Sequence, residues 1–263
     1  MSQVKYLDLA GLTAYDRKLK DWFKSGVVDI ADEAIRELFV IPVKGPVDNE
    51  IWFKANRTMT ESNITSAYTN ANVIGLKYED DWYKIVYDDS ITYINWVNDE
   101  NTRLLGSKMT EIYLPNSVVS IQWGAFHGCF SLTSIVIPDS VTSIGSEAFR
   151  RCTALTSITI PNNVTKFEDN VFYSCTSLNS IVIPNNVTSI GRFAFYECSS
   201  LTSIVIPNNV TSIGERAFAY CTHLTSITFE GTMEEWNSIE KGYYWNSNTP
   251  ATVVQCTDGD ITL

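Results

Sequence analysis

Residues 132–154 read LTSIVIPDSVTSIGSEAFRRCTA, and Leu155 begins the same pattern again. Five cysteines and five phenylalanines keep this 23-residue step. A fixed period of this size is typical of a solenoid, in which each unit buries its apolar face only against its neighbours. The sequence therefore predicts a stack of six to seven coils in which like residues lie above like. The pattern starts at Met109, Leu132, Leu155, Leu178, Leu201 and Leu224.

Each unit carries apolar residues at positions 1, 4, 6, 10, 13, 17, 18 and 21, counted from its first residue. The alternation in residues 135–137 predicts a short strand with two side chains inward and one outward. Pro138 ends this strand, because proline has no amide proton to give a neighbouring strand. The polar pair that follows and residues 144–145 predict turns, and residues 148–152 predict a short helical or irregular turn.

The repeated cysteines occupy an apolar position of the unit. Neighbouring strands lie about 4.8 Å apart, so these thiols come close to one another, yet five in a row cannot all pair. We expect buried free thiols that act as small hydrophobic groups. No metal-type spacing such as C-x-x-C occurs. The repeated cysteines are Cys129, Cys152, Cys175, Cys198 and Cys221.

The recurring motif L-x-x-I-x-I-P-x-x-V-x-x-I-G-x-x-A-F-x-x-C resembles the BspA-like, or Treponema-type, leucine-rich repeat. The resemblance implies an α+β repeat solenoid, a right-handed coil with one curved parallel sheet. It also implies a non-enzymatic protein of the cell-surface or adhesion kind. The third unit departs from the motif, with Phe167-Glu168 in place of Ile-Gly and Val171 in place of Ala. We expect this departure to affect only the local geometry.

The flanking segments divide the chain into four predicted parts. The segment from Trp82 is interpreted as a degenerate first repeat, because Ser90–Ile94 aligns with Ser140–Ile144. Thr232 and a glutamate three residues later form a capping box that opens a helix to about Lys241. A hairpin then turns across residues 258–259. The parts are residues 1–40, a helical docking or capping segment; 41–81, a linker and β-hairpin; 82–231, the repeats; and 232–263, a helix-plus-hairpin cap.

Residues 7–25 predict a helix with an apolar stripe, and a second short helix follows. The stripe is either a seam between subunits, used for docking or oligomerisation, or a face that folds back to cap the first coil. The opening residues 6–20 resemble the start of structural proteins of gut phages and prophages. That resemblance implies a virion protein. The stripe consists of Leu12, Tyr15, Leu19, Trp22 and Phe23.

The charge balance is acidic, with a formal net charge of −11 and an isoelectric point of about 4.6. Basic residues cluster only within residues 17–24, so neither nucleic acid nor an anionic membrane surface is an expected partner. The sequence contains no run of 18 apolar residues and no apolar stretch of signal-peptide length near Met1. We therefore expect neither membrane insertion nor the general secretion route.

Catalytic chemistry is not expected. Neither His127 nor His223 has a fixed nucleophile or carboxylate partner in the sequence pattern. Residues 258–260 read Asp-Gly-Asp, but the other acidic ligands of a calcium loop are missing, and a turn is the simpler interpretation. We predict no enzyme, no cofactor and no metal site.

Two surfaces are candidates for partner binding. The outward strand position forms a mildly apolar stripe, which either binds a partner or is simply solvated. The second surface, around the Ala-Phe turn, carries large aromatic residues that core packing does not dictate. These favour contact with a protein or a glycan, sugar stacking included, although single surface aromatics are common. The stripe includes Tyr113, Val136, Val182 and Val205, and the aromatic set is Trp123, Tyr173, Phe193, Tyr196 and Tyr220.

Two functions fit these observations. The first is a virion-associated fibre or decoration protein of a phage, located in the virion, whose repeats contact a host or gut surface. In that hypothesis residues 1–40 contact other virion proteins or a second copy of the chain. The alternative is a bacterial cell-surface or secreted adhesin. Both predict a surface protein or glycan as the partner.

Overall fold

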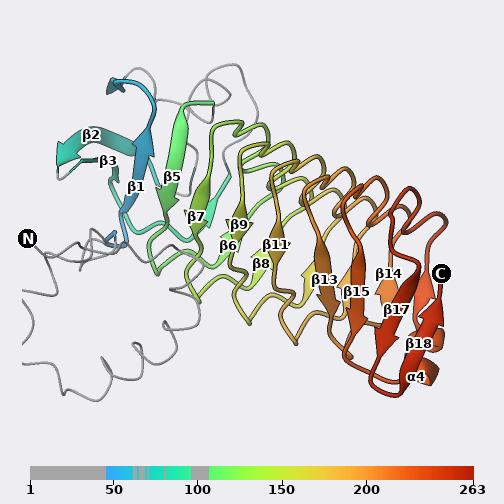
Figure 1. Ribbon diagram of the computed structural model, residues 1–263. Coiled ribbons are helices and arrows are strands. Elements are labelled where there is room, and N and C mark those ends of the chain that lie inside the picture. The colour runs from blue at the N-terminus through green and yellow to red at the C-terminus, as the bar shows by residue number, and fades with distance from the viewer. Residues whose placement is uncertain (1–45, 62–63, 65–68, 70, 80, 96–106) are drawn as a thin grey trace, which may run out of the picture. The chain divides into compact units, whose positions relative to one another are not determined.

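The structure is a computed structural model, and its described part is a parallel-strand solenoid of about seven turns (Figure 1). The described residues belong to one compact unit, Gly45–Leu263. The helices predicted within residues 1–40, with their apolar stripe, lie outside the described residues. Those described are residues 46–61, 64, 69, 71–79, 81–95 and 107–263.

Two ladders of strands run along the solenoid, whereas the sequence predicted a single sheet. Both ladders are parallel and in register, as Ile204 opposite Ile227 and Ile190 opposite Ile213 illustrate. The prediction missed the second ladder because its strands are two residues long, too short to show alternation. The first ladder contains β5 (Met109–Tyr113), β7 (Ser134–Val136), β9 (Ser157–Ile158), β11 (Ser180–Ile181), β13 (Ser203–Ile206) and β15 (Ser226–Phe229). The second contains β4 (Tyr93–Ile94), β6 (Ser120–Ile121), β8 (Ser143–Ile144), β10 (Lys166–Phe167), β12 (Ser189–Ile190), β14 (Ser212–Ile213) and β16 (Glu240–Lys241).

The core lies between the ladders and the turn that follows the second one. All eight apolar positions of the quoted unit are buried, from Leu132 to Cys152, as the sequence predicted. The phenylalanines form a continuous stack, with ring centroids 5.1–5.5 Å apart and the rings within 20° of parallel. Each buried ring stabilises the fold by roughly 2–3 kcal/mol, and each needs the coil before and after it to be covered. The stack consists of Phe126, Phe149, Phe172, Phe195 and Phe218.

The five repeated cysteines are buried free thiols, which confirms that prediction. The thiol of Cys175 donates to the carbonyl of Phe149 at 3.1 Å, and Cys221 makes the same bond to Phe195. Burial raises the pKa of both thiols to about 12. The thiols therefore fill the core and satisfy backbone carbonyls, and at neutral pH they hold no reactive thiolate.

Thiol titration should show this arrangement directly. Six cysteines are present, and only Cys256 is half-exposed. We expect one thiol per native chain to react promptly with an aromatic disulfide reagent at pH 8, and six in denaturant. At that pH a thiol of pKa about 12 is only about one part in ten thousand thiolate. The Cys256→Ser variant should release almost no reagent when native, and prompt reaction of two or more native thiols would contradict the buried ladder.

Strand pairing is interrupted in both ladders: the first breaks between β7 and β9 and between β11 and β13, and the second breaks at the third unit. Within the described repeats, strand pairing joins β4, β6 and β8, then resumes at β10 and continues to β16. The units that start at Leu132, Leu178 and Leu201 place glycine at position 14, where an added Cβ would come within 2.7 Å of Trp123 N at Gly145 and within 2.6 Å of Glu168 C at Gly191. Gln122 and Glu168 stand at this position in the first and third units. The amide of Gln122 still bonds to Ile94, so a side chain at this position does not by itself open the ladder.

The N-terminal end of the described part is an antiparallel sheet that extends the first ladder. Its strands are β1 (Glu50–Ala55), β2 (Val73–Glu79) and β3 (Trp82–Tyr87), in the order β2-β3-β1-β5-β7. The interpretation of the segment from Trp82, here β3, as the strand of a first coil is wrong. It pairs antiparallel with β1 and β2. Only β4 takes a coil position, with Ile94 opposite Ile121.

The C-terminal end contains one short helix, α4 (Met233–Ser238), and a hairpin of β17 (Val253–Cys256) and β18 (Gly259–Thr262). The capping box of Thr232 and Glu235 is present. The helix predicted to about Lys241 is three residues shorter, because Glu240–Lys241 pair with β14 and complete the second ladder. Apart from α4, the described residues contain no α-helix, so the predicted helix-plus-hairpin cap is present with a shorter helix, and the helical N-terminal segment receives no support.

Candidate partner-binding surface

The turn after the second ladder carries two left-handed residues per coil, four positions apart. The first of these turns uses glycine, with φ of 62° at Gly124 and 73° at Gly128. Later turns use other residues, with φ between 51° and 61°. A left-handed conformation costs a residue with a side chain about 1–2 kcal/mol relative to the right-handed one. The pairs are Glu147 and Arg151, Asn170 and Ser174, Phe193 and Glu197, Arg216 and Tyr220, and Tyr244 and Asn248.

Aromatic residues at these strained positions need a reason other than local backbone preference. Phe193, Tyr220 and Tyr244 all have positive φ, which is unusual for bulky side chains. Residues held in such conformations cluster at functional sites in proteins. On the turn face, therefore, core packing and backbone preference do not account for which residues are present.

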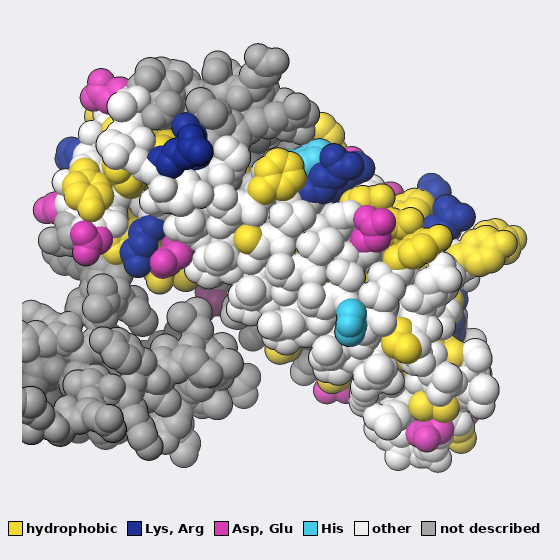
Figure 2. Space-filling view, turned by 45° about the horizontal axis from the view of Figure 1, so that its top comes forward, with side chains coloured by type: hydrophobic (Ala, Val, Ile, Leu, Met, Phe, Trp, Pro, Cys, Tyr) yellow, Lys and Arg dark blue, Asp and Glu magenta, His cyan; other side chains and the backbone are white. Residues whose placement is uncertain are grey.

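A row of stacked groups runs along this face from coil to coil. The guanidinium of Arg150 lies 4.6 Å from the ring centroid of Tyr173. Tyr173 and Tyr196 stack at 4.8 Å with 14° between their planes, and Tyr220 follows at 5.2 Å and 55°. Figure 2 shows hydrophobic and basic side chains gathered along one edge of the repeats. The row fixes the rings in place before any partner arrives.

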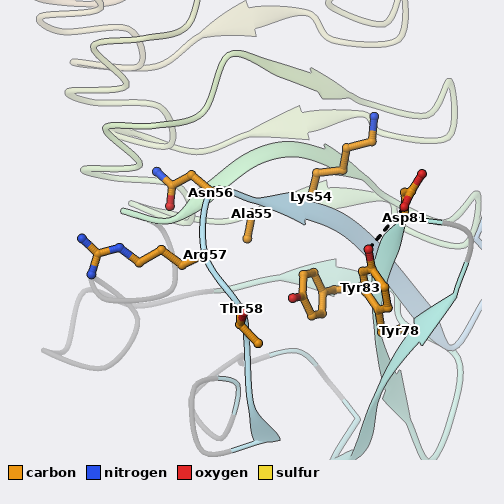
Figure 3. A pocket seen from close by; sticks show the side chains of 8 residues that line it. All are labelled: Lys54, Ala55, Asn56, Arg57, Thr58, Tyr78, Asp81 and Tyr83. Atoms are coloured by element: carbon orange, nitrogen blue, oxygen red, sulfur yellow. Dashed lines mark hydrogen bonds between the residues drawn. The ribbon is translucent and has the colours of Figure 1, made fainter.

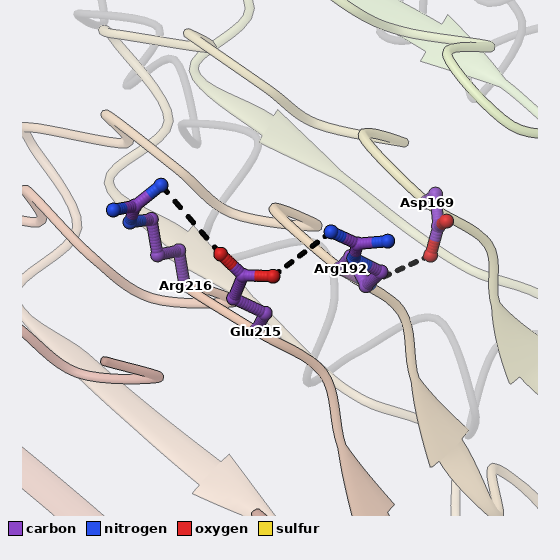
Figure 4. Close-up of polar contacts among 4 residues, drawn as sticks. All are labelled: Asp169, Arg192, Glu215 and Arg216. Atoms are coloured by element: carbon purple, nitrogen blue, oxygen red, sulfur yellow. Dashed lines mark hydrogen bonds and ion pairs between the residues drawn. The ribbon is translucent and has the colours of Figure 1, made fainter. Parts of the chain in front are cut away.

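Phe193 lies beside this row and between two arginines. Its ring meets that of Tyr196 edge to face at 5.6 Å. The guanidinium carbons of Arg192 and Arg216 lie 6.0 and 5.9 Å from its centroid. Glu215 joins the two arginines, at 2.8 Å from Arg192 and 3.6 Å from Arg216 (Figure 4). We call the whole set the tyrosine–arginine belt: Arg150, Tyr173, Arg192, Phe193, Tyr196, Arg216, Tyr220 and Tyr244.

The structure brings together four of the five predicted aromatic residues. Trp123 is 52% exposed and, among the described residues, has no ring contact with the belt. Tyr244, which the prediction omitted, lies 5.5 Å from the guanidinium of Arg216. The 23-residue count does not reach Tyr244, because α4 lies between it and the last full unit. Gly242 marks the equivalent position, since its amide donates to the carbonyl of Ile213 just as the amide of Gly214 donates to that of Ile190.

The geometry of the belt argues against stacking of sugar rings on its central tyrosines. Tyr173 and Tyr196 cover each other, and their outer faces meet Arg150 and Tyr220. Burial is the main cause that raises the pKa of Tyr196, and Glu197 adds to it. On these central tyrosines, ring edges and hydroxyls remain for a partner, beside the neighbouring guanidiniums, while Tyr220 and Tyr244 are 42% and 65% exposed. Such groups are typical of protein–protein contact sites.

The strand stripe is only partly the surface that the sequence predicted. Val182 is 79% exposed, and Val136 and Val205 are each 46% exposed. Tyr113 lies opposite Val136 in register, but it packs edge-on against Trp82 at 4.9 Å. Burial raises the pKa of Tyr113, and Glu111 adds to this shift. The stripe is thus three separate valines among Ser and Thr, with no charged group to orient a ligand.

A wide hollow of about 430 Å³ opens beside β1, β2 and β3 (Figure 3). Tyr78 donates to Asp81 at 3.3 Å, and Tyr83 accepts from the amide of Met59. Lys54 is paired with Glu111. Tyr78 and Asp81 bond to each other, Lys54 and Tyr83 bond to residues outside the lining, and the side chains are splayed, so the hollow shows no converging ligand set.

The structure offers no metal cluster in the residues it describes. Asp258 accepts a hydrogen bond from the amide of Met233 at 2.7 Å, so the carboxylate of Asp258 has a structural role. His223 Nδ1 lies 2.6 Å from the carbonyl of Ser199, and His127 Nδ1 lies 3.5 Å from Glu147. No helix in the described part is long and apolar enough to span a bilayer.

Parallel coils in register, with a leucine or methionine opening each unit and buried isoleucines on its strand, define a leucine-rich repeat solenoid. Residues 100–225 match the family described as the BspA type leucine rich repeat region, in six copies. This match agrees with the resemblance read from the motif.

The chain is also similar to solved structures. A leucine-rich cell surface protein from Faecalibacterium prausnitzii is 35% identical, with a TM-score of 0.50 over 66% of this chain and 42% of that one. The T. pallidum leucine-rich repeat protein is 34% identical, with a TM-score of 0.45 over 49% of this chain and 58% of that one. The chain thus spans less than half the length of the F. prausnitzii protein. No curated protein matches the sequence.

The resemblance of residues 6–20 to phage structural proteins receives no support from these comparisons. The matched family and the similar structures are leucine-rich repeat proteins, and the F. prausnitzii protein is described as a cell surface protein. The virion role is therefore not supported, and the alternative, a surface adhesin, fits better.

Proposed function

We propose that this chain is a binding module of a bacterial cell-surface or secreted protein, and that its tyrosine–arginine belt contacts the partner. The observation that carries the proposal is the belt itself. Three of its aromatic residues, Phe193, Tyr220 and Tyr244, stand at turn positions with positive φ, although the first such turn in the same chain uses glycine. The likeness to a leucine-rich cell surface protein supports a role at the bacterial surface.

The belt suits a protein partner. Tyrosine and arginine are enriched among the residues that dominate binding energy at protein interfaces. Tyrosine provides a large contact area at a low cost in side-chain entropy. The stack of Tyr173 and Tyr196 and the bridge through Glu215 hold the groups in place, so little ordering is needed on binding.

Adhesion of coated microspheres tests the proposal. Spheres carrying the full chain should attach to surfaces coated with extracellular-matrix proteins or mucin. We expect the variant Tyr173→Ala/Tyr196→Ala to lose about tenfold or more in attachment, because interface tyrosines each contribute about 1–2 kcal/mol. The variant Val182→Asp places a charge on the strand stripe and serves as the matched control, with attachment unchanged.

The reverse pattern would contradict the assignment of the belt. Loss of attachment in Val182→Asp, with the tyrosine variant unaffected, would place the partner on the strand stripe. Attachment to none of the coated surfaces would contradict the binding role itself. Circular dichroism melting of both variants confirms that each remains folded.

A further inference from the structure

We infer that the partner of the tyrosine–arginine belt is an acidic protein segment, an inference that rests on the proposed function. The distribution of arginine is the first reason. The described residues include five arginines, and four of them lie on the turn face. Arginine presents a planar fork of donors that matches a carboxylate with two parallel hydrogen bonds. The four are Arg150, Arg151, Arg192 and Arg216.

The carboxylates of the same face are already engaged. Asp169 accepts the backbone amide of Arg192 at 2.7 Å, and Glu197 accepts the hydroxyl of Ser174 at 2.6 Å. Glu147 pairs with Arg150 at 3.3 Å. Together with Glu215, these four acids offset the four arginines in charge but use only a few of their donors.

Several guanidinium donors therefore face solvent. Arg192 and Arg216 share the single carboxylate of Glu215, and Asp169 bonds to the backbone of Arg192 rather than to its guanidinium, so each guanidinium keeps unused donors. Arg151 is exposed and, among the described residues, makes no ion pair. A guanidinium carries five N–H donors, so an incoming carboxylate can be bound without breaking the existing pairs.

The rest of the chain repels such a partner. The turn face carries four arginines against four carboxylates, so the net charge of −11 lies elsewhere. Acidic residues gather at the N-terminal sheet, for example Asp81, Asp88 and Asp89. An acidic segment is then disfavoured over most of the surface and directed to the belt, since charge complementarity governs the encounter and its register.

The tyrosines decide between an acidic protein and an acidic polysaccharide. A sugar ring would need a free aromatic face. The more exposed rings, Tyr220 and Tyr244, lie only at the C-terminal end of the row, and the central rings, Tyr173 and Tyr196, cover one another. Their edges and hydroxyls can instead contact peptide groups and aliphatic side chains that flank a carboxylate. The belt thus combines anchors for carboxylates with a contact surface for a polypeptide.

Binding of poly-L-glutamate to the immobilised full chain tests the inference. We expect Arg192→Glu to weaken binding about tenfold or more, because it reverses a charge at the contact. Lys166→Glu makes the same charge change on an exposed lysine outside the belt and should alter affinity by about twofold at most. Arg192→Lys keeps the charge but removes the planar fork, and should fall between the two.

Three results would overturn the inference: no binding of poly-L-glutamate, equal effects of Arg192→Glu and Lys166→Glu, or polygalacturonate bound as tightly as the polypeptide. The last result would make the ligand an acidic polysaccharide. If the tyrosine variant lost attachment to matrix proteins while Arg192→Glu retained it, the proposed function would stand and only the acidic partner would be wrong.

Discussion

Replacing Phe172 by alanine is expected to lower the free energy of unfolding by about 3–5 kcal/mol, the usual range for a buried phenylalanine. The ring stacks on Phe149 at 5.5 Å and on Phe195 at 5.4 Å, and its edge meets Phe167 at 5.8 Å. The cavity would therefore open in the middle of the ring stack, where each coil is covered only by its neighbours. Urea denaturation followed by circular dichroism measures the change.

Tyr173→Ala is the matched control for this substitution. It removes an aromatic ring from the next residue, which lies on the half-buried turn face rather than in the core. The loss should be about 1 kcal/mol. If the two variants were equally stable, the phenylalanine stack would not be the main support of the central coils.

The Gly214→Ala variant is expected to be less stable by about 2–3 kcal/mol, because overpacking against backbone atoms cannot be relieved by a rotamer change. A Cβ at this position would lie 2.5 Å from the amide nitrogen of Arg192 and 2.6 Å from the carbonyl carbon of Gly191. The backbones of the second ladder would have to move apart at this point. The shift in thermal midpoint and in urea midpoint measures the effect.

Gly75→Ala provides the control, because a Cβ there would meet no atom within 4 Å. Alanine reduces the freedom of the unfolded chain, so we expect a change between zero and about 0.5 kcal/mol in favour of the folded state. A destabilisation of similar size in both variants would show that close coil contact at Gly214 is not the cause.

The repeat made most of the solenoid predictable from the sequence. Because each buried position recurs in every unit, the core from Leu132 to Cys152 could be read by comparing units with one another. The free thiols followed from the same comparison. The capping box at Thr232 followed from local chemistry alone.

The failures lie where periodicity ends or is too short to read. A strand of two residues, such as Ser143–Ile144, has no alternation to recognise. The segment from Trp82 resembled a coil by sequence, but an antiparallel partner, β1, separates it from β5. Tyr244 was missed because the helix before it breaks the 23-residue count. The belt as a set could be predicted only in part, since ring contacts across coils depend on which way each turn directs its side chains.

The left-handed pairs also bear on how such a chain can change over generations. Each pair gives a coil two sites whose side chains play little part in the interior, so they can be exchanged without disturbing the stack. Duplication of one 23-residue unit would lengthen the solenoid by one coil and would also add two more sites of this kind. New specificity could then arise by copying and point substitution, while the interior remains the same.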